Sequence, residues 1–211
     1  MIETSPAKSA RPLHSVAVFC GSSRGRAPEH IALATRLGKA IAARGLKLVY
    51  GGGGLGLMGA VARAAQDGGG HVLGVIPELL REAEALLPDI EHEIVPDMHT
   101  RKIRMYGEAD AFIILPGGIG TLEEAVEVLS WQRLNLHEKP ILFLSDTGFW
   151  DNLLGEFQRL IHEGFAAPAM AADILRAASV EAAFETIIDR LENPIERQPL
   201  VLREASVESL A

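Results

Sequence analysis

Residues 116–124 combine three glycines with two adjacent carboxylates, so phosphate binding and acid–base chemistry could meet in one short stretch. An apolar run at 111–115 precedes it and an amphipathic run follows, which is the order of a strand, a glycine turn and a helix. A helix that begins at about Thr121 would aim free N–H groups and its positive dipole end at the turn. The stretch therefore predicts a turn suited to a phosphate group.

The carboxylate of Glu124 has two interpretations. In the first, Thr121 and Glu124 form a capping box, in which Thr121 caps the helix and Glu124 turns back to the Thr121 backbone N–H. In the second, Glu124 enters the pocket beside the phosphate turn, where a bound phosphate would repel it. A carboxylate in that position therefore implies a chemical role, such as steering a water molecule or stabilising a cationic sugar.

Residues 51–59 match the pattern G-x-G-x-x-G twice and predict a second glycine turn after a strand. A dinucleotide-binding site requires an acidic residue about 20 residues after the glycine motif, at the end of the next strand. Glu78 has that spacing, but Pro77 breaks the strand before it. A tight turn for helix packing and part of a nucleotide or phosphate site both remain open. A P-loop is excluded, because alanine follows Gly38 and Lys39 where a hydroxyl would hold magnesium.

The adjacent cations Arg101 and Lys102 lie on a polar segment, 99–108, that leads directly into the strand at 111–115. Such a pair can simply be a solvated surface pair. The connection to that strand nevertheless brings the segment beside the same sheet, so Arg101 could be the fixed cation that partners Glu124 or a substrate oxygen.

Other site chemistries find little support. The seven histidines lack metal-ligand spacing, so no metal site is expected, and no serine sits on a nucleophile elbow. The single cysteine, Cys20, ends an apolar run and is expected to be a buried, inert thiol. The few lysines have no convincing pyridoxal phosphate context, and no cofactor is expected.

Apolar strand runs alternate with helical segments along the whole chain, which predicts one α/β domain with a doubly wound, mostly parallel sheet. Both glycine turns and the turn at 21–23 follow strands directly, so all three should share the rim at the strands' carboxyl ends. The expected strands cover 15–20, 46–50, 71–76, 91–95, 111–115, 140–145 and 174–177. The expected helices cover 28–44, 60–66, 79–86, 99–108, 121–136, 149–163 and 180–191.

Length and composition fit this architecture. The 211 residues suit a single domain at 13–192, with an N-terminal tail at 1–12 and a C-terminal tail at 193–211. A net charge of −8 argues against a nucleic-acid partner, whose binding would rest on a basic face. No apolar run reaches the roughly 18 residues of a membrane span, and no secretory signal is recognisable, so a cytoplasmic location is expected.

Three motifs together resemble the LOG ("lonely guy") family of cytokinin riboside 5′-monophosphate phosphoribohydrolases, long labelled lysine decarboxylases. They are the glycine stretch at 50–59, the segment 98–102 and the stretch 116–124, and the similarity extends roughly from Ser15 to Glu192. The resemblance implies a Rossmann-like fold, a homodimer or an assembly of dimers, and no cofactor. It implies hydrolysis of the N-glycosidic bond between an adenine-type base and ribose 5′-phosphate.

The resemblance also implies site residues. The catalytic pair falls on Arg101 and Glu124, and the glutamate before the basic pair falls on Glu84, with Glu82 as the alternative. We expect Glu124 to face the ribose and Arg101 to hold it ionised. The nucleotide-contacting positions comprise Arg101, Lys102, Gly117, Gly118, Ile119, Gly120, Thr121, Leu122, Glu123 and Ser130. The shared rim adds Ser22, Gly52, Gly53 and Met58.

The chain departs from the family pattern at two places. Thr100 stands where many members have glutamine or glutamate, and Gly54 and Leu55 replace a common Ser-Val pair. Neither change touches a catalytic position, but both could alter which base is preferred. A general purine nucleotide nucleosidase and a non-catalytic nucleotide-binding or carrier protein are therefore kept as alternatives.

Overall fold

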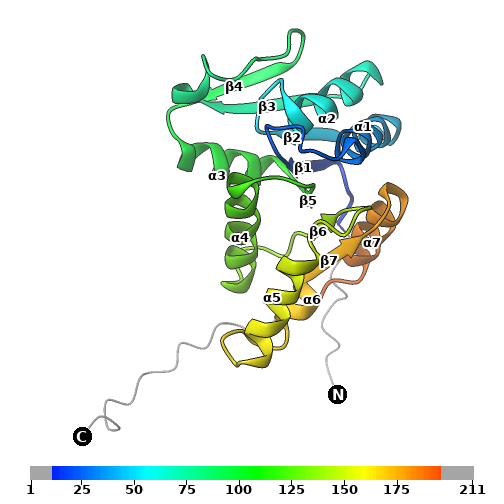
Figure 1. The fold of residues 1–211 in the computed structure, drawn as a ribbon, viewed down its shortest axis with the longest axis vertical. Helices are drawn as coiled ribbons and strands as arrows, with labels where there is room; N and C mark the ends of the chain where they lie inside the picture. The colour runs from blue at the N-terminus through cyan, green and yellow to red at the C-terminus, as the bar shows by residue number, and fades with distance from the viewer. Residues whose placement is uncertain (1–10, 196–211) are drawn as a thin grey trace, which may run out of the picture.

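A computed structural model describes residues 11–195, which form a single seven-stranded sheet covered by helices (Figure 1). The strand order is β4-β3-β2-β1-β5-β6-β7, and every strand pair is parallel. The expected doubly wound α/β fold is confirmed, and within the described sheet it is entirely rather than mostly parallel. The predicted tails at 1–12 and 193–211 lie largely outside the described residues.

The strands are β1 (Ser15–Phe19), β2 (Lys47–Tyr50), β3 (Val72–Pro77), β4 (Glu91–Val95), β5 (Ala111–Ile114), β6 (Ile141–Leu144) and β7 (Ile174–Ala177). The helices are α1 (Pro28–Ala43), α2 (Gly56–Asp67), η1 (Glu78–Leu80), α3 (Met98–Glu108), α4 (Ile119–Arg133), α5 (Asp151–His162), α6 (Met170–Asp173) and α7 (Val180–Glu192). No helix in this part of the chain is long and apolar enough to cross a membrane.

Helices cover the sheet in two layers, and the apolar strand runs face both. One core lies under α1, α2 and α7, and it includes Leu33, Val61 and Phe184. The second core lies under α3, α4 and α5, and it includes Met105 and Leu129. Coverage on both faces explains why the strands show continuous apolar runs instead of an alternating pattern.

The order of the strands reverses next to β1, which pairs with β2 on one side and with β5 on the other. In open parallel sheets such a reversal leaves a crevice beyond the carboxyl ends of the two central strands. The turns that follow β1, β2 and β5 all reach this crevice, so the topology alone brings the three predicted turns to one place.

Several helix boundaries differ from the sequence-based expectation. The helix α2 begins at Gly56 rather than at 60, so the last part of the second glycine stretch is helical. The helix expected at 79–86 is only a short 3₁₀ turn, and α6 was not predicted. The helix α4 begins at Ile119 with Gly118 as its N-cap, and no side chain caps it. The capping-box interpretation of Thr121 is therefore wrong, because Thr121 already lies inside the helix.

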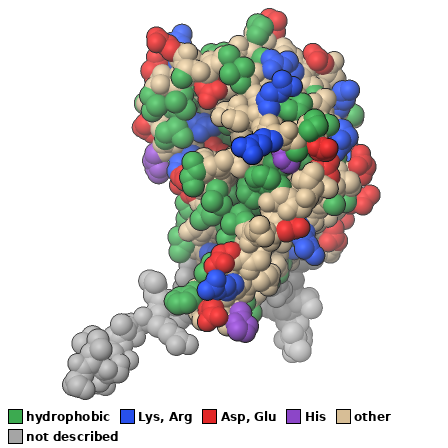
Figure 2. All heavy atoms as spheres, viewed as in Figure 1, with side chains coloured by type: hydrophobic (Ala, Val, Ile, Leu, Met, Phe, Trp, Pro, Cys, Tyr) green, Lys and Arg blue, Asp and Glu red, His purple; other side chains and the backbone are tan. Residues whose placement is uncertain are grey.

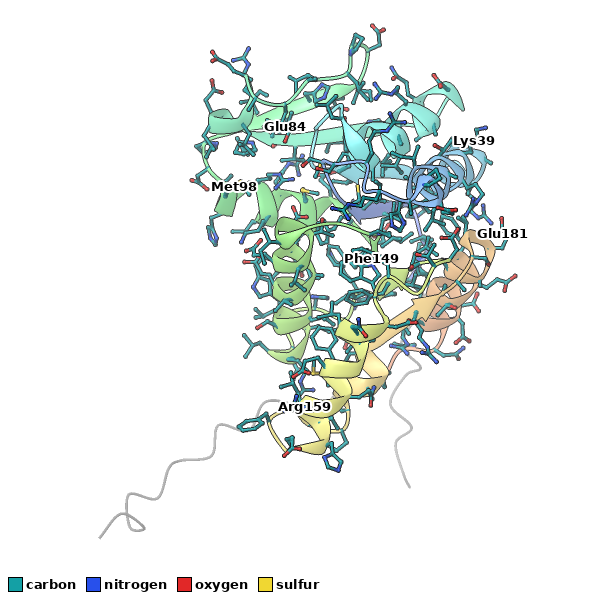
Figure 3. All side chains as sticks on the ribbon, viewed as in Figure 1. Lys39, Glu84, Met98, Phe149, Arg159 and Glu181 are labelled. Atoms are coloured by element: carbon teal, nitrogen blue, oxygen red, sulfur yellow. The ribbon has the colours of Figure 1, made fainter. Side chains whose placement is uncertain are left out.

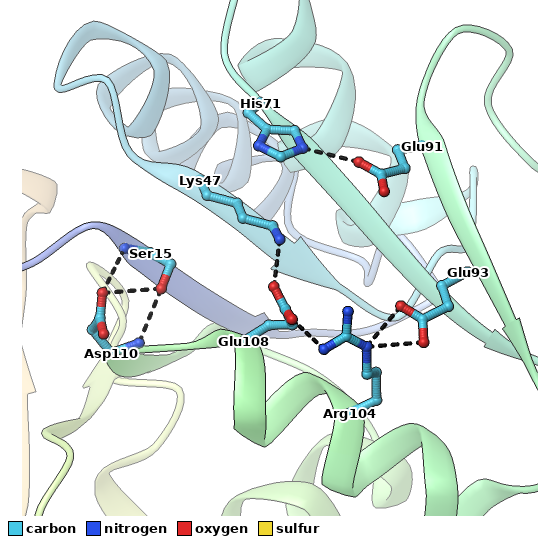
Figure 4. Close-up of polar contacts among 8 residues, drawn as sticks. All are labelled: Ser15, Lys47, His71, Glu91, Glu93, Arg104, Glu108 and Asp110. Atoms are coloured by element: carbon cyan, nitrogen blue, oxygen red, sulfur yellow. Dashed lines mark hydrogen bonds and ion pairs between the residues drawn. The ribbon is translucent and has the colours of Figure 1, made fainter.

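A network of polar contacts joins the amino ends of the strands, on the edge opposite the crevice (Figure 4). Lys47 at the start of β2 contacts Glu108 at 2.5 Å, and Arg104 contacts both Glu108 and Glu93. The Nε2 of His71, just before β3, lies 3.0 Å from Oε2 of Glu91, the first residue of β4. These charged side chains pair with one another across neighbouring helices and strands, so the amino ends of the strands have a structural role.

Asp110 anchors the same edge. Its Oδ2 accepts hydrogen bonds from the backbone N–H groups of His14 and Ser15 at 2.8 and 2.9 Å, and from the Ser15 hydroxyl at 3.0 Å. One carboxylate thus fixes the start of β1 against the start of β5.

We predict that Asp110→Ala lowers the free energy of unfolding by about 1–3 kcal/mol, because it leaves partly buried donors without an acceptor. Urea denaturation followed by circular dichroism measures the loss. The matched control is Glu78→Ala, which removes an exposed carboxylate 3.6 Å from Arg81 and should change stability by less than about 0.5 kcal/mol. Equal effects of the two substitutions would contradict the role given to Asp110.

Candidate active site

Three turns meet in the crevice, and Gly21 joins them. Its N–H donates to the carbonyl oxygen of Pro116 at 3.1 Å, which ties the turn after β1 to the turn after β5. Its carbonyl oxygen accepts from the N–H groups of Leu57 and Met58 at 3.0 and 3.3 Å, at the start of α2. The predicted common rim is therefore observed.

Arg101 and Glu124 form a buried ion pair at this rim. The guanidinium Nη1 lies 3.0 Å from Oε1 of Glu124, and both side chains are at least nine-tenths buried. The Nε of Arg101 donates to the carbonyl oxygen of Val75 at 3.1 Å, which holds the guanidinium against β3. Gly51 makes room for it, because a Cβ there would collide with Nη2. Glu124 therefore pairs with Arg101 and does not turn back to the Thr121 backbone N–H.

The helix α3 is fixed at the end that carries Arg101. Asp97 is the N-cap, and its carboxylate accepts from the N–H of Thr100 at 2.7 Å. Arg101 follows in the first turn, so a well-defined helix start aims its side chain at the crevice. The helix was expected to begin at His99 and begins one residue earlier.

Burial raises the pKa of two groups at the site. It raises the pKa of Glu124 to about 7, and the positive charge of Arg101 opposes that shift without cancelling it. Burial also raises the pKa of Cys20, mainly through desolvation and further through the charge of Glu124. The thiol is therefore protonated, as expected for an inert buried cysteine.

Lys102 points to a different group of carboxylates. Its Nζ lies 2.5 Å from Glu123 and 2.9 Å from Glu127, and these two partners raise its pKa. Sequence reasoning placed Lys102 and Glu123 together in the substrate site. In the structure, the two side chains form an ion pair with each other, where α3 and α4 lie next to each other.

The second glycine turn is packed closely on all sides. Gly52 has φ 83°, a conformation that favours glycine, and a Cβ at this position would overlap Ile76. A Cβ at Gly53 would overlap the carboxylate of Glu84 and approach the sulfur of Met58. The structure therefore places Glu84 at the turn, and Figure 3 shows it on the segment between β3 and β4.

Glu82, the alternative to Glu84, is exposed, whereas Glu84 is partly buried. Ser130 does not join the other predicted residues. It lies on the exposed side of α4, six residues beyond Glu124 and therefore about 9 Å further along the helix axis. Ser22, Gly118, Ile119 and Gly120 are exposed at the mouth of the crevice.

A cavity of about 410 Å³ opens next to the turn after β5. Gly21, Gly117 and Gly118 line it, together with three residues that sequence reasoning missed: Arg26, His30 and Phe149. Arg26 and His30 follow the first strand closely, and that proximity was the one available signal. Phe149 arrives from the turn after β6, and only the fold brings it here (Figure 3).

This arrangement is that of a Rossmann-like α/β protein with a cavity at the topological switch point of the sheet, where ligands bind in proteins of this fold. Solved structures share the fold. A molybdenum cofactor binding protein from Rippkaea orientalis matches with a TM-score of 0.65 and 21% identity, over 84% of this chain and 97% of the other. A molybdenum cofactor carrier protein from Chlamydomonas reinhardtii matches with a TM-score of 0.65 and 22% identity, over 85% and 98% of the two chains.

Sequence comparison gives the family. Residues 58–187 match a family model described as "Possible lysine decarboxylase". Two Arabidopsis thaliana proteins named cytokinin riboside 5′-monophosphate phosphoribohydrolase are similar to the chain. LOG7 is 47% identical over 164 residues, covering 77% of this chain and 75% of its own. LOG1 is 40% identical over 194 residues, covering 92% and 89%.

A probable rice member (Oryza sativa subsp. japonica), LOGL5, is 46% identical over 163 residues, and the match covers 77% of this chain and 66% of the relative. The chain belongs to the LOG family, as the three sequence motifs indicated.

The description of the family model raises the question of decarboxylation, which usually uses a cofactor bound to lysine as a Schiff base. Such a lysine must lose its proton readily. Lys102, which lies beside the crevice, is held by two carboxylates that raise its pKa. Lys102 therefore does not fit the role of a Schiff-base lysine.

We predict that Glu124 makes stability depend on pH with a sign unusual for a carboxylate. Because the folded state raises its pKa from 4.5 to about 7, the folded state holds this proton more tightly than the unfolded state does. The contribution of Glu124 is fully present below pH 4.5 and is lost as the pH rises through about 7.

Urea denaturation below pH 4.5 and above pH 7 measures this effect, with Glu124→Gln as the reference. The wild-type protein should lose stability relative to the glutamine variant between the two conditions. A difference that is independent of pH would contradict the raised pKa.

Proposed function

We propose that this protein hydrolyses the N-glycosidic bond of cytokinin riboside 5′-monophosphates and releases the free adenine-type base and ribose 5-phosphate. The observation that carries the proposal is the buried Arg101–Glu124 pair beside the glycine turn that begins α4. The relatives named above carry this activity in their names, and the chain shares 40–47% identity with them.

The reaction breaks the bond between the anomeric carbon and the base nitrogen, and the bonding electrons leave with the base. Positive charge then builds up on the ribose, as in other glycosyl cleavages. A water molecule adds its hydroxyl to the anomeric carbon, and its proton ends on the base. The carboxylate of Glu124 either stabilises the positive ribose or orients this water and accepts its proton on the way.

Arg101 acts on Glu124 in this mechanism. Its guanidinium favours the ionised carboxylate, against the burial that raises the pKa of Glu124 to about 7. Near neutral pH the carboxylate therefore exchanges its proton easily, a property that suits a group that takes up and returns a proton.

The remaining predicted residues serve binding in this proposal. The N–H groups at the start of α4, together with Thr121, hold the 5′-phosphate, because the first turn of a helix leaves such donors free. Phosphate binding then aligns the ribose with Glu124. Glu84, Gly52, Gly53 and Met58 lie on the other side of the crevice, where we place the base.

We propose further that the protein is a homodimer. Several large apolar side chains are exposed on α3 and α4, and Figure 2 shows apolar side chains along the side of the molecule that these helices form. They are Met98, Ile103, Ile119 and Val126. Ser130 also lies on the exposed surface of α4. In a dimer it would contact the substrate that is bound to the second copy of the chain. The cytoplasmic location stays a prediction, which a fluorescent fusion would test.

We predict that Glu124→Gln and Arg101→Gln each reduce turnover of isopentenyladenosine 5′-monophosphate by about 100-fold or more, because each removes one half of the catalytic pair. Release of free base, measured by liquid chromatography, follows the reaction. For the wild-type protein, kcat should rise as the pH passes through about 7 and Glu124 ionises.

Glu181→Gln, an exposed position on α7, is the matched control and should keep wild-type turnover. Activity near the wild-type value in both site variants would overturn the assignment. Rates on AMP, GMP and the prenylated nucleotide separate a cytokinin enzyme from a general purine nucleotide nucleosidase. Tight nucleotide binding without release of base would instead indicate a carrier.

We predict that Val126→Glu converts the dimer to a monomer, because it places a charge in an apolar contact surface. Sedimentation velocity measures the change, and Ile188→Glu, an exposed apolar position on α7, serves as the control. If neither substitution changes the sedimentation coefficient, α3 and α4 do not form the contact surface.

A further inference from the structure

Opposite charges in the crevice pair with one another. On its acid-rich side, the carboxylates of Glu123, Glu124 and Glu127 hold Arg101 and Lys102 in ion pairs. A second cavity, of about 380 Å³, on the same rim of the sheet also has charges of both signs among its lining residues. Two of these charges remain unpaired, which sets this cavity apart from the crevice.

The second cavity lies beyond the carboxyl ends of β6 and β7, where the helix α5 begins. Ligands of open parallel sheets bind at this rim. The cavity shares no lining residue with the one beside the turn after β5, so the two are separate. Its polar lining residues are Ser145, Asp146, Asp151 and Arg176, and its apolar ones include Phe143, Trp150, Leu154 and Ala177.

Arg176 and Asp151 are the unpaired charges. Arg176 lies opposite Phe143 in the sheet, so its side chain is on the face that α5 covers. No hydrogen bond or ion pair to any of residues 11–195 is found for the side chain of Arg176 or of Asp151. Asp146, the third charged residue at the cavity, is engaged by Arg36 at 2.5 Å.

Backbone geometry holds the carboxylate of Asp151 at the cavity. Gly148 has φ 69°, and a Cβ at this position would lie 2.5 Å from Oδ2 of Asp151. Asp151 is also the first residue of α5, where a carboxylate stabilises the positive end of the helix. That role explains the sign of the charge, but it leaves the carboxylate oxygens able to accept hydrogen bonds from a ligand.

The indole of Trp150 supplies a donor without a partner. Trp150 lines the cavity and is only 6% exposed, and its buried Nε1 has no hydrogen-bond partner among the described residues. The rings of Phe143 and Phe149 pack edge-on against the indole, with centroids 5.6 and 4.8 Å away, so packing fixes its position. A buried N–H without an acceptor is costly, and a ligand oxygen that accepts from it removes that cost.

A cation, an anion and a buried N–H donor around one cavity match a ligand that is itself zwitterionic. A carboxylate can accept from Arg176 and from the Trp150 N–H, and an ammonium group can donate to Asp151. An α-amino acid carries both groups on one carbon atom. A phosphate monoester would be repelled by Asp151, and a simple cation would be repelled by Arg176.

We propose that this cavity binds a free α-amino acid with an apolar side chain. Arg176 and Trp150 hold its carboxylate, Asp151 holds its ammonium group, and Phe143 and Leu154 form the apolar wall that receives its side chain. The site is separate from the crevice, so the inference does not rest on the proposed function. Phe149 packs against Trp150 and lines the crevice cavity, and it is therefore the wall between the two sites.

The test measures binding of L-leucine to the full chain by isothermal titration calorimetry. Two analogues each lack one charge, since 4-methylpentanoate has no ammonium group and 3-methylbutylamine has no carboxylate. Both should bind at least about 10-fold more weakly than L-leucine, because each loses a charged hydrogen bond.

Arg176→Gln should weaken L-leucine binding by about 10-fold or more and remove the preference for L-leucine over 3-methylbutylamine. Asp151→Asn should instead remove the preference over 4-methylpentanoate. Trp150→Phe, which keeps an aromatic ring, should also weaken L-leucine binding. Arg159→Gln and Glu156→Gln are matched controls, since both exposed residues are on α5 but do not line the cavity.

A loss of each preference in its own variant, with unchanged binding in both controls, supports the inference. A general loss of affinity that leaves both preferences intact indicates a structural effect and overturns it. Absence of L-leucine binding to the wild-type protein at millimolar concentration also overturns it, and equal binding of L-lysine overturns the apolar side chain. Circular dichroism verifies that each variant is folded. Because binding is measured without turnover, failure of the proposed function and failure of this site are distinguishable.

Discussion

The buried ion pair between Arg101 and Glu124 is the interaction on which the rest of the site depends. Removing two charges from water costs several kcal/mol for each ion, and breaking such a pair by losing one partner typically costs about 3–5 kcal/mol. The fold offsets this cost with specific features. The carbonyl oxygen of Val75 accepts from Arg101, Gly51 leaves space for the guanidinium, and Asp97 caps the helix that carries it.

The amino ends and the carboxyl ends of the strands have different roles, the first structural and the second chemical. At the amino edge, charged groups neutralise each other across neighbouring elements, as Lys47, Glu108 and Arg104 do. At the carboxyl edge, the glycine turns bring backbone close to backbone and leave a crevice. Parallel strands make this separation possible, because all their carboxyl ends meet at one edge.

The acid-rich side of the crevice has a chemical use in the proposed reaction. Carboxylates repel a phosphate, but they stabilise the positive charge that builds up on the ribose as the base leaves. A protein with a net charge of −8 can therefore bind an anionic substrate, provided that its free cations and helix N-termini are gathered elsewhere. Arg26 and the N-caps of α1 and α4 line the cavity on the other side of the crevice.

The sequence by itself determined the alternation of strands and helices, the three turns at one rim, the family, and the identity of the Arg101 and Glu124 candidates. These signals are local, since they rest on apolar runs, glycines and short motifs. Only the tertiary structure decided that α4 begins at Ile119, that Glu124 faces Arg101 rather than the Thr121 backbone, and that His30 and Phe149 share a cavity. The physical reason is that burial, charge pairing and free volume arise between segments far apart in the chain, and a pattern along one segment does not contain them.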